Sequence, residues 1–97
     1  MTIEKTASAG TLESSDILVT VEKGEPKKGV VIKLTSSVSK QFGKQIKTVI
    51  TECVQTLGFE DLIVTAVDSG ALDCTIRARV KTAIYRACGS TDYVWEA

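Results

Sequence analysis

The segment best able to support chemistry is Gly10–Asp16, which reads Gly-Thr-Leu-Glu-Ser-Ser-Asp. It places two neighbouring hydroxyls, Ser14 and Ser15, between the carboxylates of Glu13 and Asp16. Because the chain contains no histidine, neither serine can be activated by a histidine base as in a hydrolase. A serine here can still accept a group from a separate enzyme that supplies its own base. The alternative is a simple turn, in which Ser and Asp side chains bond to the local backbone.

A second candidate is a set of basic residues on the second predicted helix: Arg77, Arg79, Lys81 and Arg86. Arg77 and Lys81 are four residues apart and share a face, whereas Arg79 and Arg86 lie on a neighbouring one. Such a set is either an ordinary solvated face or a contact for phosphates or an acidic partner, since arginine suits phosphate oxygens.

The three cysteines, Cys53, Cys74 and Cys88, are odd in number and have no Cys-x-x-Cys spacing. This pattern does not support a disulfide framework or a structural zinc site. We therefore expect three buried free thiols. Without histidine or a ligand cluster, we predict neither a catalytic residue nor a metal site.

Composition limits the remaining classes of function. The 97 residues suit a single domain, and 43% hydrophobic residues are enough for one core. Twelve basic and twelve acidic residues balance, which argues against general nucleic-acid binding. No apolar run approaches the roughly 20 residues of a membrane span. The N-terminus lacks the pattern of a secretory signal, so we expect a cytoplasmic protein.

Apolar periodicity predicts five elements. Residues 17–21, 30–34 and 62–67 are typical of strands. The turn at 23–29, with the only proline, predicts that the first two strands form a hairpin. Two amphipathic helices are expected, one that begins at a cap at Ser36 or Ser37 and ends just before Gly58, and one from about 71 to 88. Their apolar stripes are Val38, Phe42, Ile46, Val49, Ile50, Cys53, Val54 and Leu57, and Leu72, Ile76, Val80, Ala83, Ile84 and Ala87.

The order β-β-α-β-α predicts the α+β class, because one-sided helices need a sheet face to cover. We expect a two-layer sandwich with a small three-stranded sheet, strand order 2-1-3, and both helices on one face. Residues 1–97 form one domain in this interpretation. Residues 1–16 are a flexible N-terminal loop that holds the serines, and residues 90–97 are a tail whose Tyr93, Val94 and Trp95 dock back on the domain.

Four blocks of the sequence resemble the acyl carrier (gamma) subunits of citrate lyase. They are Ala9–Asp16, Ser36–Gly43, Gly70–Cys74 with the following Arg77-Ala78-Arg79, and the terminal Trp95-Glu96. The blocks follow the order of the family and span nearly the whole chain. The resemblance implies a non-catalytic single carrier domain.

The resemblance also implies a cofactor and partners. Ser14 would carry 2'-(5''-phosphoribosyl)-3'-dephospho-CoA through a phosphodiester, and the arm would present acetyl and citryl thioesters. The implied partners are the alpha subunit (citrate CoA-transferase), the beta subunit (citryl-CoA lyase) and a prosthetic-group transferase. We hypothesise that Glu13 and Asp16 help this transferase recognise the loop.

Two other interpretations remain. The carrier subunit of malonate decarboxylase is similar and uses the same kind of arm, although Thr11-Leu12-Glu13-Ser14 and Trp95-Glu96 favour citrate lyase. A small interaction module would instead have no covalent group on Ser14.

Overall fold

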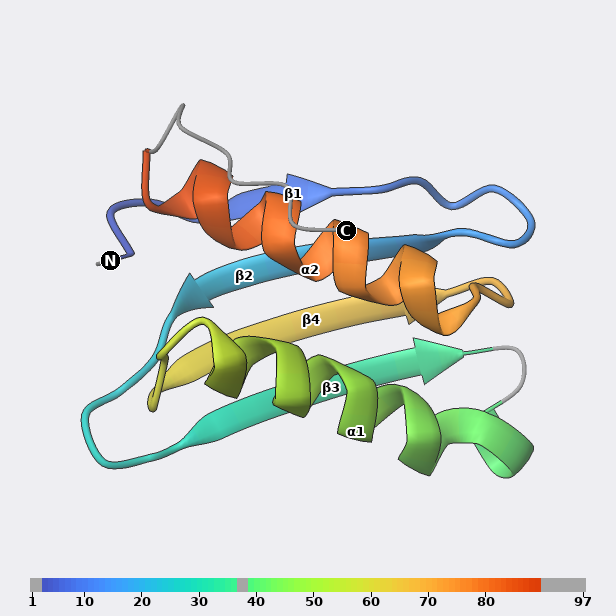
Figure 1. Cartoon of the computed structure of the whole chain (residues 1–97), viewed down its shortest axis with the longest axis horizontal. Coiled ribbons are helices and arrows are strands. Elements are labelled where there is room, and N and C mark those ends of the chain that lie inside the picture. The colour runs from blue at the N-terminus through green and yellow to red at the C-terminus, as the bar shows by residue number, and fades with distance from the viewer. Residues whose placement is uncertain (1–2, 37–38, 90–97) are drawn as a thin grey trace.

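The computed structural model describes residues 3–36 and 39–89. The chain forms, in order, the six elements that Figure 1 shows: β1 (Ala7–Ala9), β2 (Ile17–Lys23), β3 (Val30–Ser36), α1 (Ser39–Thr56), β4 (Leu62–Asp68) and α2 (Asp73–Ala87). The predicted cap residue Ser37, the predicted core residue Val38 and the predicted tail 90–97 lie outside the described residues.

The four strands form one mixed sheet in the order β1-β2-β4-β3. β2 pairs antiparallel with both β1 and β4, with Val19 opposite Ala9 on one side and Ala66 on the other. β3 pairs parallel with β4, with Val30 opposite Leu62. The last strand in the sequence therefore lies inside the sheet, between β2 and β3.

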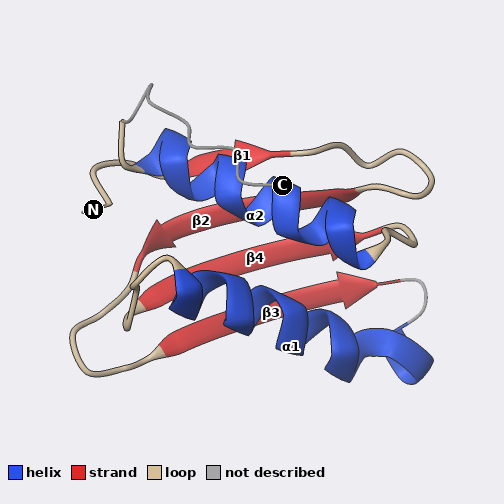
Figure 2. Ribbon diagram, viewed as in Figure 1, coloured by secondary structure: helices blue, strands red, loops and turns tan. Residues whose placement is uncertain are grey.

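Both helices cover the same face of the sheet, as Figure 2 shows. α2 packs on β1 and β2, whereas α1 packs on β3. The strands alternate, so that Ile17, Val19 and Val21 of β2 are buried while Leu18 and Thr20 are only partly covered. The core therefore lies between the sheet and the helices, which confirms the α+β two-layer class.

The predicted sheet was wrong in its strand order and number. The strands 17–23 and 30–36 do not form a hairpin, because β4 is inserted between them. Asp61, just before β4, accepts hydrogen bonds from the N–H groups of Lys27 (3.2 Å) and Gly29 (2.8 Å). These bonds hold the turn between β2 and β3 against the start of β4. The nearly continuous apolar run of β4, Leu62-Ile63-Val64, is typical of a strand with neighbours on both sides.

The fourth strand, β1, lies within the predicted N-terminal loop. Its residues are small (Ala-Ser-Ala), which lets α2 approach it closely. The segment before it is also fixed, since Ile3 is buried and the N–H groups of Glu4 and Lys5 donate to the carbonyl of Ala87 (2.8 and 3.1 Å). The loop proper is thus residues 10–16, and its flexibility stays a prediction.

The helical stripes form the core, with one exception in each helix. Ile46, Val49, Ile50, Cys53 and Val54 of α1 and Ile76, Val80, Ala83, Ile84 and Ala87 of α2 are buried. Phe42 and Leu72, which were predicted to belong to the same stripes, are exposed. In the described residues, no helix has both the length and the apolar character needed to cross a bilayer.

Candidate attachment site

The loop between β1 and β2 ends in a tight turn with Ser14 at its tip. The N–H of Asp16 donates to the carbonyl of Glu13 (3.2 Å), which closes a four-residue turn. Ser15 has a φ of 65°, so the turn has the pattern of type II, in which the third residue is left-handed. Ser14 is therefore the second residue of the turn, the position that projects from its corner.

Ser14 is accessible and uncommitted within the described part of the chain. Its side chain is exposed, and no hydrogen bond of residues 3–36 and 39–89 occupies its hydroxyl. Ser15 is also exposed, but its backbone takes the strained left-handed conformation and its N–H is bonded elsewhere. Both hydroxyls are exposed, so the choice of Ser14 over Ser15 stays a prediction.

The Ser14 turn is fastened to the turn that follows β4. The N–H of Ser15 donates to the carbonyl of Ser69 (2.8 Å), and the N–H of Ser69 donates to the carbonyl of Asp16 (2.9 Å). The Ser69 hydroxyl also donates to the carbonyl of Leu12 (3.4 Å). Two loops that are more than fifty residues apart in sequence thus form one unit at the end of the sheet where both helices begin (Figure 1).

Asp16 anchors the loop from inside. Its carboxylate accepts from the Thr11 hydroxyl (2.7 Å) and the Ile17 N–H (2.7 Å). The Arg79 guanidinium completes the set, donating from Nε (3.0 Å) and Nη2 (2.9 Å) to the two carboxylate oxygens. These hydrogen bonds, first from Arg79 and then from Thr11 and Ile17, hold the pKa of Asp16 well below its ordinary value of 3.8.

The anchor assigns different roles to the two carboxylates of the motif. Asp16 is buried and fully engaged, so its direct contribution is to the shape of the loop. Glu13 is exposed, with its side chain turned to solvent beside Ser14. The hypothesis that both contact a transferase stays a prediction, and the geometry favours Glu13 for it.

Gly10 allows the loop to leave β1. Its φ is 103°, and a Cβ at this position would lie 1.8 Å from the carbonyl oxygen of Ile17 and 3.3 Å from Cδ of Arg79. A side chain here would therefore collide with backbone that cannot move without disturbing β2. The glycine of the motif is a steric requirement of the fold.

The basic set on α2 makes internal contacts. Arg77 pairs with Glu52 of α1 (3.4 Å), Arg79 with Asp16, and Nη1 of Arg86 donates to the carbonyl of Ser8 in β1 (2.9 Å). Three of the four side chains thus tie α2 to its neighbours. Their use as a phosphate or partner contact stays a prediction.

The cysteines are free, but only one is buried as expected. Cys53 is buried, Cys88 is half-buried and Cys74 is exposed in the first turn of α2. Burial raises the pKa of the Cys53 and Cys88 thiols. The prediction of three buried thiols was wrong for Cys74, because the apolar stripe of α2 does not include it, and Cys88 at the C-terminal end of α2 is only half-buried.

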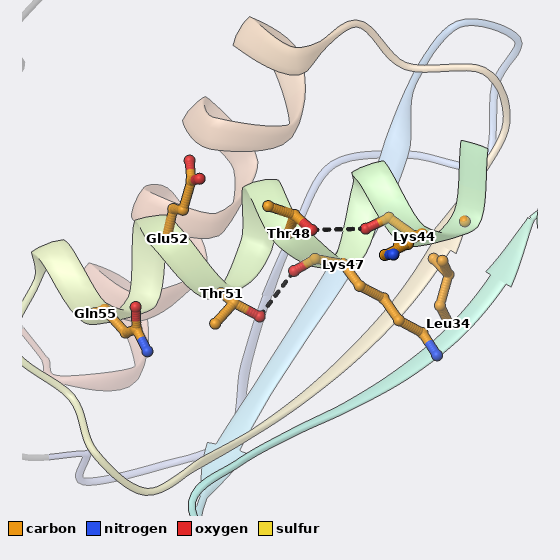
Figure 3. Close-up of a pocket in the computed structure, with 8 residues that line it drawn as sticks. Leu34, Lys44, Lys47, Thr48, Thr51, Glu52 and Gln55 are labelled. Atoms are coloured by element: carbon orange, nitrogen blue, oxygen red, sulfur yellow. Dashed lines mark hydrogen bonds between the residues drawn. The ribbon is translucent and has the colours of Figure 1, made fainter.

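The described residues of α1 line two larger hollows. One, about 660 Å³, runs along α1 beside β3 and is shown in Figure 3. The hydroxyls of Thr48 and Thr51 there donate to the carbonyls of Lys44 and Lys47 (2.9 and 2.8 Å) rather than into the hollow. The trough is lined mainly by side chains with polar ends, and these two hydroxyls do not point into it.

The other hollow, about 460 Å³, is lined by the start of α1 and by the turn after β4. We call it the end groove; its lining residues are Phe42, Gln45, Ile46, Asp68, Gly70, Ala71, Leu72 and Asp73. It adjoins the Ser14 unit through Ser69, the residue before Gly70. Sequence reasoning missed it, because Phe42 and Leu72 fit the apolar stripes of the two helices and were assigned to the core.

The site is suited to holding a covalent group through Ser14. The hydroxyl is exposed to solvent in a tight turn. Arg79 balances the negative charge of Asp16, which lowers the repulsion that an anionic phosphodiester on Ser14 would meet. The chemistry of the turn therefore fits attachment by another enzyme and provides no base of its own.

Comparison with known proteins places the chain. The family model "ACP", described as "Malonate decarboxylase delta subunit (MdcD)", matches residues 4–87. The chain is 52% identical over 96 residues to the citrate lyase acyl carrier protein of Streptococcus mutans serotype c. It is 51% identical to that of Streptococcus uberis and 49% identical to that of Latilactobacillus sakei. Each alignment covers 99% of this chain and 93% of the relative.

A solved structure shares the fold. A chain in the crystal structure of a Pseudomonas malonate decarboxylase hetero-tetramer in complex with malonate superposes with a TM-score of 0.73 over 88% of this chain and 86% of that one. The sequence identity is 21%, so the likeness concerns the fold alone. On the sequence matches over nearly its full length, the chain belongs to the family of citrate lyase acyl carrier proteins.

Proposed function

We propose that the chain is the covalent carrier subunit of a citrate lyase and that Ser14 is its attachment residue. The observation that carries the proposal is the Ser14 turn: an exposed, uncommitted hydroxyl on a turn held from both sides, in a chain about 50% identical to citrate lyase acyl carrier proteins. The proposed group is 2'-(5''-phosphoribosyl)-3'-dephospho-CoA, joined to Ser14 Oγ by a phosphodiester.

When bound, this group supplies a terminal thiol that carries acetyl or citryl as a thioester while citrate is cleaved to acetate and oxaloacetate. The chain itself performs no catalytic step. Ser14 holds the arm, and the Asp16–Arg79 pair fixes the position from which the arm extends. Tethering raises the local concentration of the acyl group at a partner's active site, which replaces a bimolecular encounter by an intramolecular one.

The proposed partners follow from the same reasoning. They are the alpha subunit (citrate CoA-transferase), the beta subunit (citryl-CoA lyase) and the transferase that loads Ser14. The proposed location is the cytoplasm.

Intact-protein mass spectrometry tests the attachment. The chain is produced together with the loading enzymes of a citrate lyase system, in parallel with Ser14→Ala and Ser15→Ala. We expect a mass gain equal to the phosphoribosyl-dephospho-CoA group in the wild type and in Ser15→Ala, and none in Ser14→Ala. A gain that persists in Ser14→Ala and disappears in Ser15→Ala would move the site by one residue.

A malonate decarboxylase carrier is the second candidate, because the matching family model is described by that enzyme's delta subunit. Reconstitution separates the two functions. The loaded chain is mixed with citrate lyase alpha and beta subunits, and separately with the other subunits of a malonate decarboxylase. We expect oxaloacetate from citrate in the first mixture and no carbon dioxide from malonate in the second. The reverse result would assign the chain to malonate decarboxylase.

A further inference from the structure

The end groove exposes apolar surface at an unusual place. Among the described residues, four large apolar side chains are markedly exposed: Leu12 (64%), Phe42 (47%), Leu72 (69%) and Val31 (39%). Phe42 and Leu72 line the end groove, and Leu12 is in the Ser14 loop. Contiguous apolar exposure of this kind marks interaction sites, because it is costly to leave in water.

The groove is continuous with the attachment turn. Ser69 bonds to the backbone of Leu12, Ser15 and Asp16, and the next three residues, Gly70, Ala71 and Leu72, form one wall of the groove. Through Ser69, the exposed Leu12 of the Ser14 loop is thus linked to the groove wall that contains the exposed Leu72. Among the described residues, the trough along α1 is lined mainly by charged, hydroxyl and amide side chains, and none of the four exposed large apolar residues lines it.

The groove is preorganised and of one charge sign. Its charged lining residues are Asp68 and Asp73. Asp68 is buried and accepts from Ser36, Gly70 and Ala71 (2.9, 3.1 and 3.0 Å), which shapes the wall. Asp73 is exposed, and the Gln45 amide donates to both its oxygens (3.3 Å each), linking α2 to α1 across the groove.

These features favour a protein occupant over the arm. The arm is rich in phosphate, and the carboxylates of Asp73 and Glu13 would repel it. A protein with a protruding apolar side chain and neighbouring Lys or Arg residues matches both the apolar walls and the acidic rim. The fixed walls lower the ordering cost of such docking.

We infer that the end groove, with Leu12, is the docking surface for the prosthetic-group transferase, which inserts an apolar side chain between Phe42 and Leu72 and faces Asp73 and Glu13 with basic residues. This inference rests on the proposed function, since the transferase must come close to Ser14 to load it.

The test measures binding without loading. The ¹⁵N-labelled Ser14→Ala chain is titrated with the purified transferase and followed by NMR. We expect line broadening and shifts confined to residues 10–16, 42–46 and 69–73. Leu72→Gln and Phe42→Gln, placed in the same background, should weaken binding by about tenfold or more. The matched control is Val31→Gln, the same change at an exposed apolar residue outside the groove, which should leave the dissociation constant unchanged.

Charge is tested separately. Asp73→Asn should weaken binding at low salt by a few-fold and reduce its dependence on salt, because exposed interface charges act over about a Debye length. Unfolding midpoints of all variants are measured first, so that a folding defect is not counted as a loss of docking.

Several results would overturn the docking inference: no binding to the Ser14→Ala chain, equal binding by Leu72→Gln and Phe42→Gln, or perturbations centred on the trough beside β3. Shifts at Phe42 and Leu72 in the loaded carrier alone would assign the groove to the arm instead. A different measurement would contradict the proposed function: the absence of a mass gain in the unmutated chain by mass spectrometry.

Discussion

At the scale of single residues, Asp16 decides the shape of the Ser14 loop, residues 10–16. Its carboxylate joins the loop (Thr11), the first strand residue of β2 (Ile17) and a helix of the other half of the chain (Arg79). The sequence placed Asp16 beside the serines but could not show its partner, because Arg79 is 63 residues away. The same separation hid the structural use of the arginine.

The depressed pKa of Asp16 predicts a specific pH dependence. The unfolded chain binds a proton at Asp16 near pH 3.8, whereas the folded chain does so only at lower pH. The stabilisation is therefore fully present above about pH 4 and is lost as pH falls toward the folded-state pKa. We expect Asp16→Asn to be less stable than the wild type at pH 7, with the difference shrinking below pH 4.

Urea denaturation at pH 7, 4 and 3 measures this difference, with Glu22→Gln as a control at an exposed carboxylate. A constant gap between wild type and Asp16→Asn at all three values would show that the Asp16–Arg79 pair does not form in solution.

Cys74 should be the first thiol to react in the native protein. It is exposed, whereas burial raises the pKa of Cys53 and Cys88 and so lowers their thiolate fractions. We expect Ellman's reagent to label one thiol rapidly, and Cys74→Ser to remove this fast phase. If the fast phase survives in Cys74→Ser, one of the other thiols is exposed in solution.

At the scale of elements, the attachment loop depends on how β1 leads into β2. Gly10→Ala would place a Cβ against the Ile17 carbonyl, so we expect a loss of roughly 3 kcal/mol in the free energy of unfolding. Gly58→Ala is the matched control: φ is 86° there, but a Cβ would meet nothing within 4 Å. It should cost only about 1 kcal/mol, the strain of the left-handed backbone.

Chemical denaturation of the two variants gives the comparison. Equal losses of unfolding free energy would mean that the loop after β1 relaxes to accommodate the side chain. The close approach of Gly10 to Ile17 would then not contribute to the cost of the substitution.

The sequence predicted the positions of the helices and strands better than it predicted which strands pair with one another. Periodicity located both helices and β2, β3 and β4 to within a few residues, since burial of one face leaves a regular pattern. β1 was missed because Ala7-Ser8-Ala9 has neither β-branched nor aromatic residues. The pairing of the strands could not be predicted either, because the turn at 24–29 is compatible with a hairpin. The hydrogen bond from Gly29 to Asp61 that holds this turn joins residues far apart in the sequence, and no local pattern indicates it.

The candidate site was predictable only in part. The serines between two carboxylates drew attention to the Ser14 loop, and the family resemblance selected Ser14. The end groove was hidden, because Phe42 and Leu72 fit the helical stripes as well as any core residue. Whether a residue at the end of a stripe is exposed depends on where the sheet beneath the helix ends, and the local sequence pattern gives no information about that.

At the scale of the whole molecule, β4 is the strand on which the sheet depends. It alone joins the antiparallel pair β1–β2 to β3, and its Leu62, Val64 and Ala66 are fully buried. We expect its amides to exchange with deuterium most slowly, and those of the three-residue edge strand β1 to exchange much faster. Native-state hydrogen exchange followed by NMR measures both, and protection of β1 equal to that of β4 would contradict a sheet organised around β4.

The late position of β4 in the sequence also sets the order of events during synthesis. While the ribosome has made only the first sixty residues, β2 and β3 have no strand between them, and the Ser14 turn lacks both Ser69 and Arg79. Long-range pairing of this kind closes only after nearly the whole chain has emerged. The nascent chain therefore displays Leu12-Glu13-Ser14 without the shape that surrounds it later. Under the proposed function, a loading enzyme that recognises the folded turn would act only on finished chains, and unfinished or misfolded copies would not receive the prosthetic group.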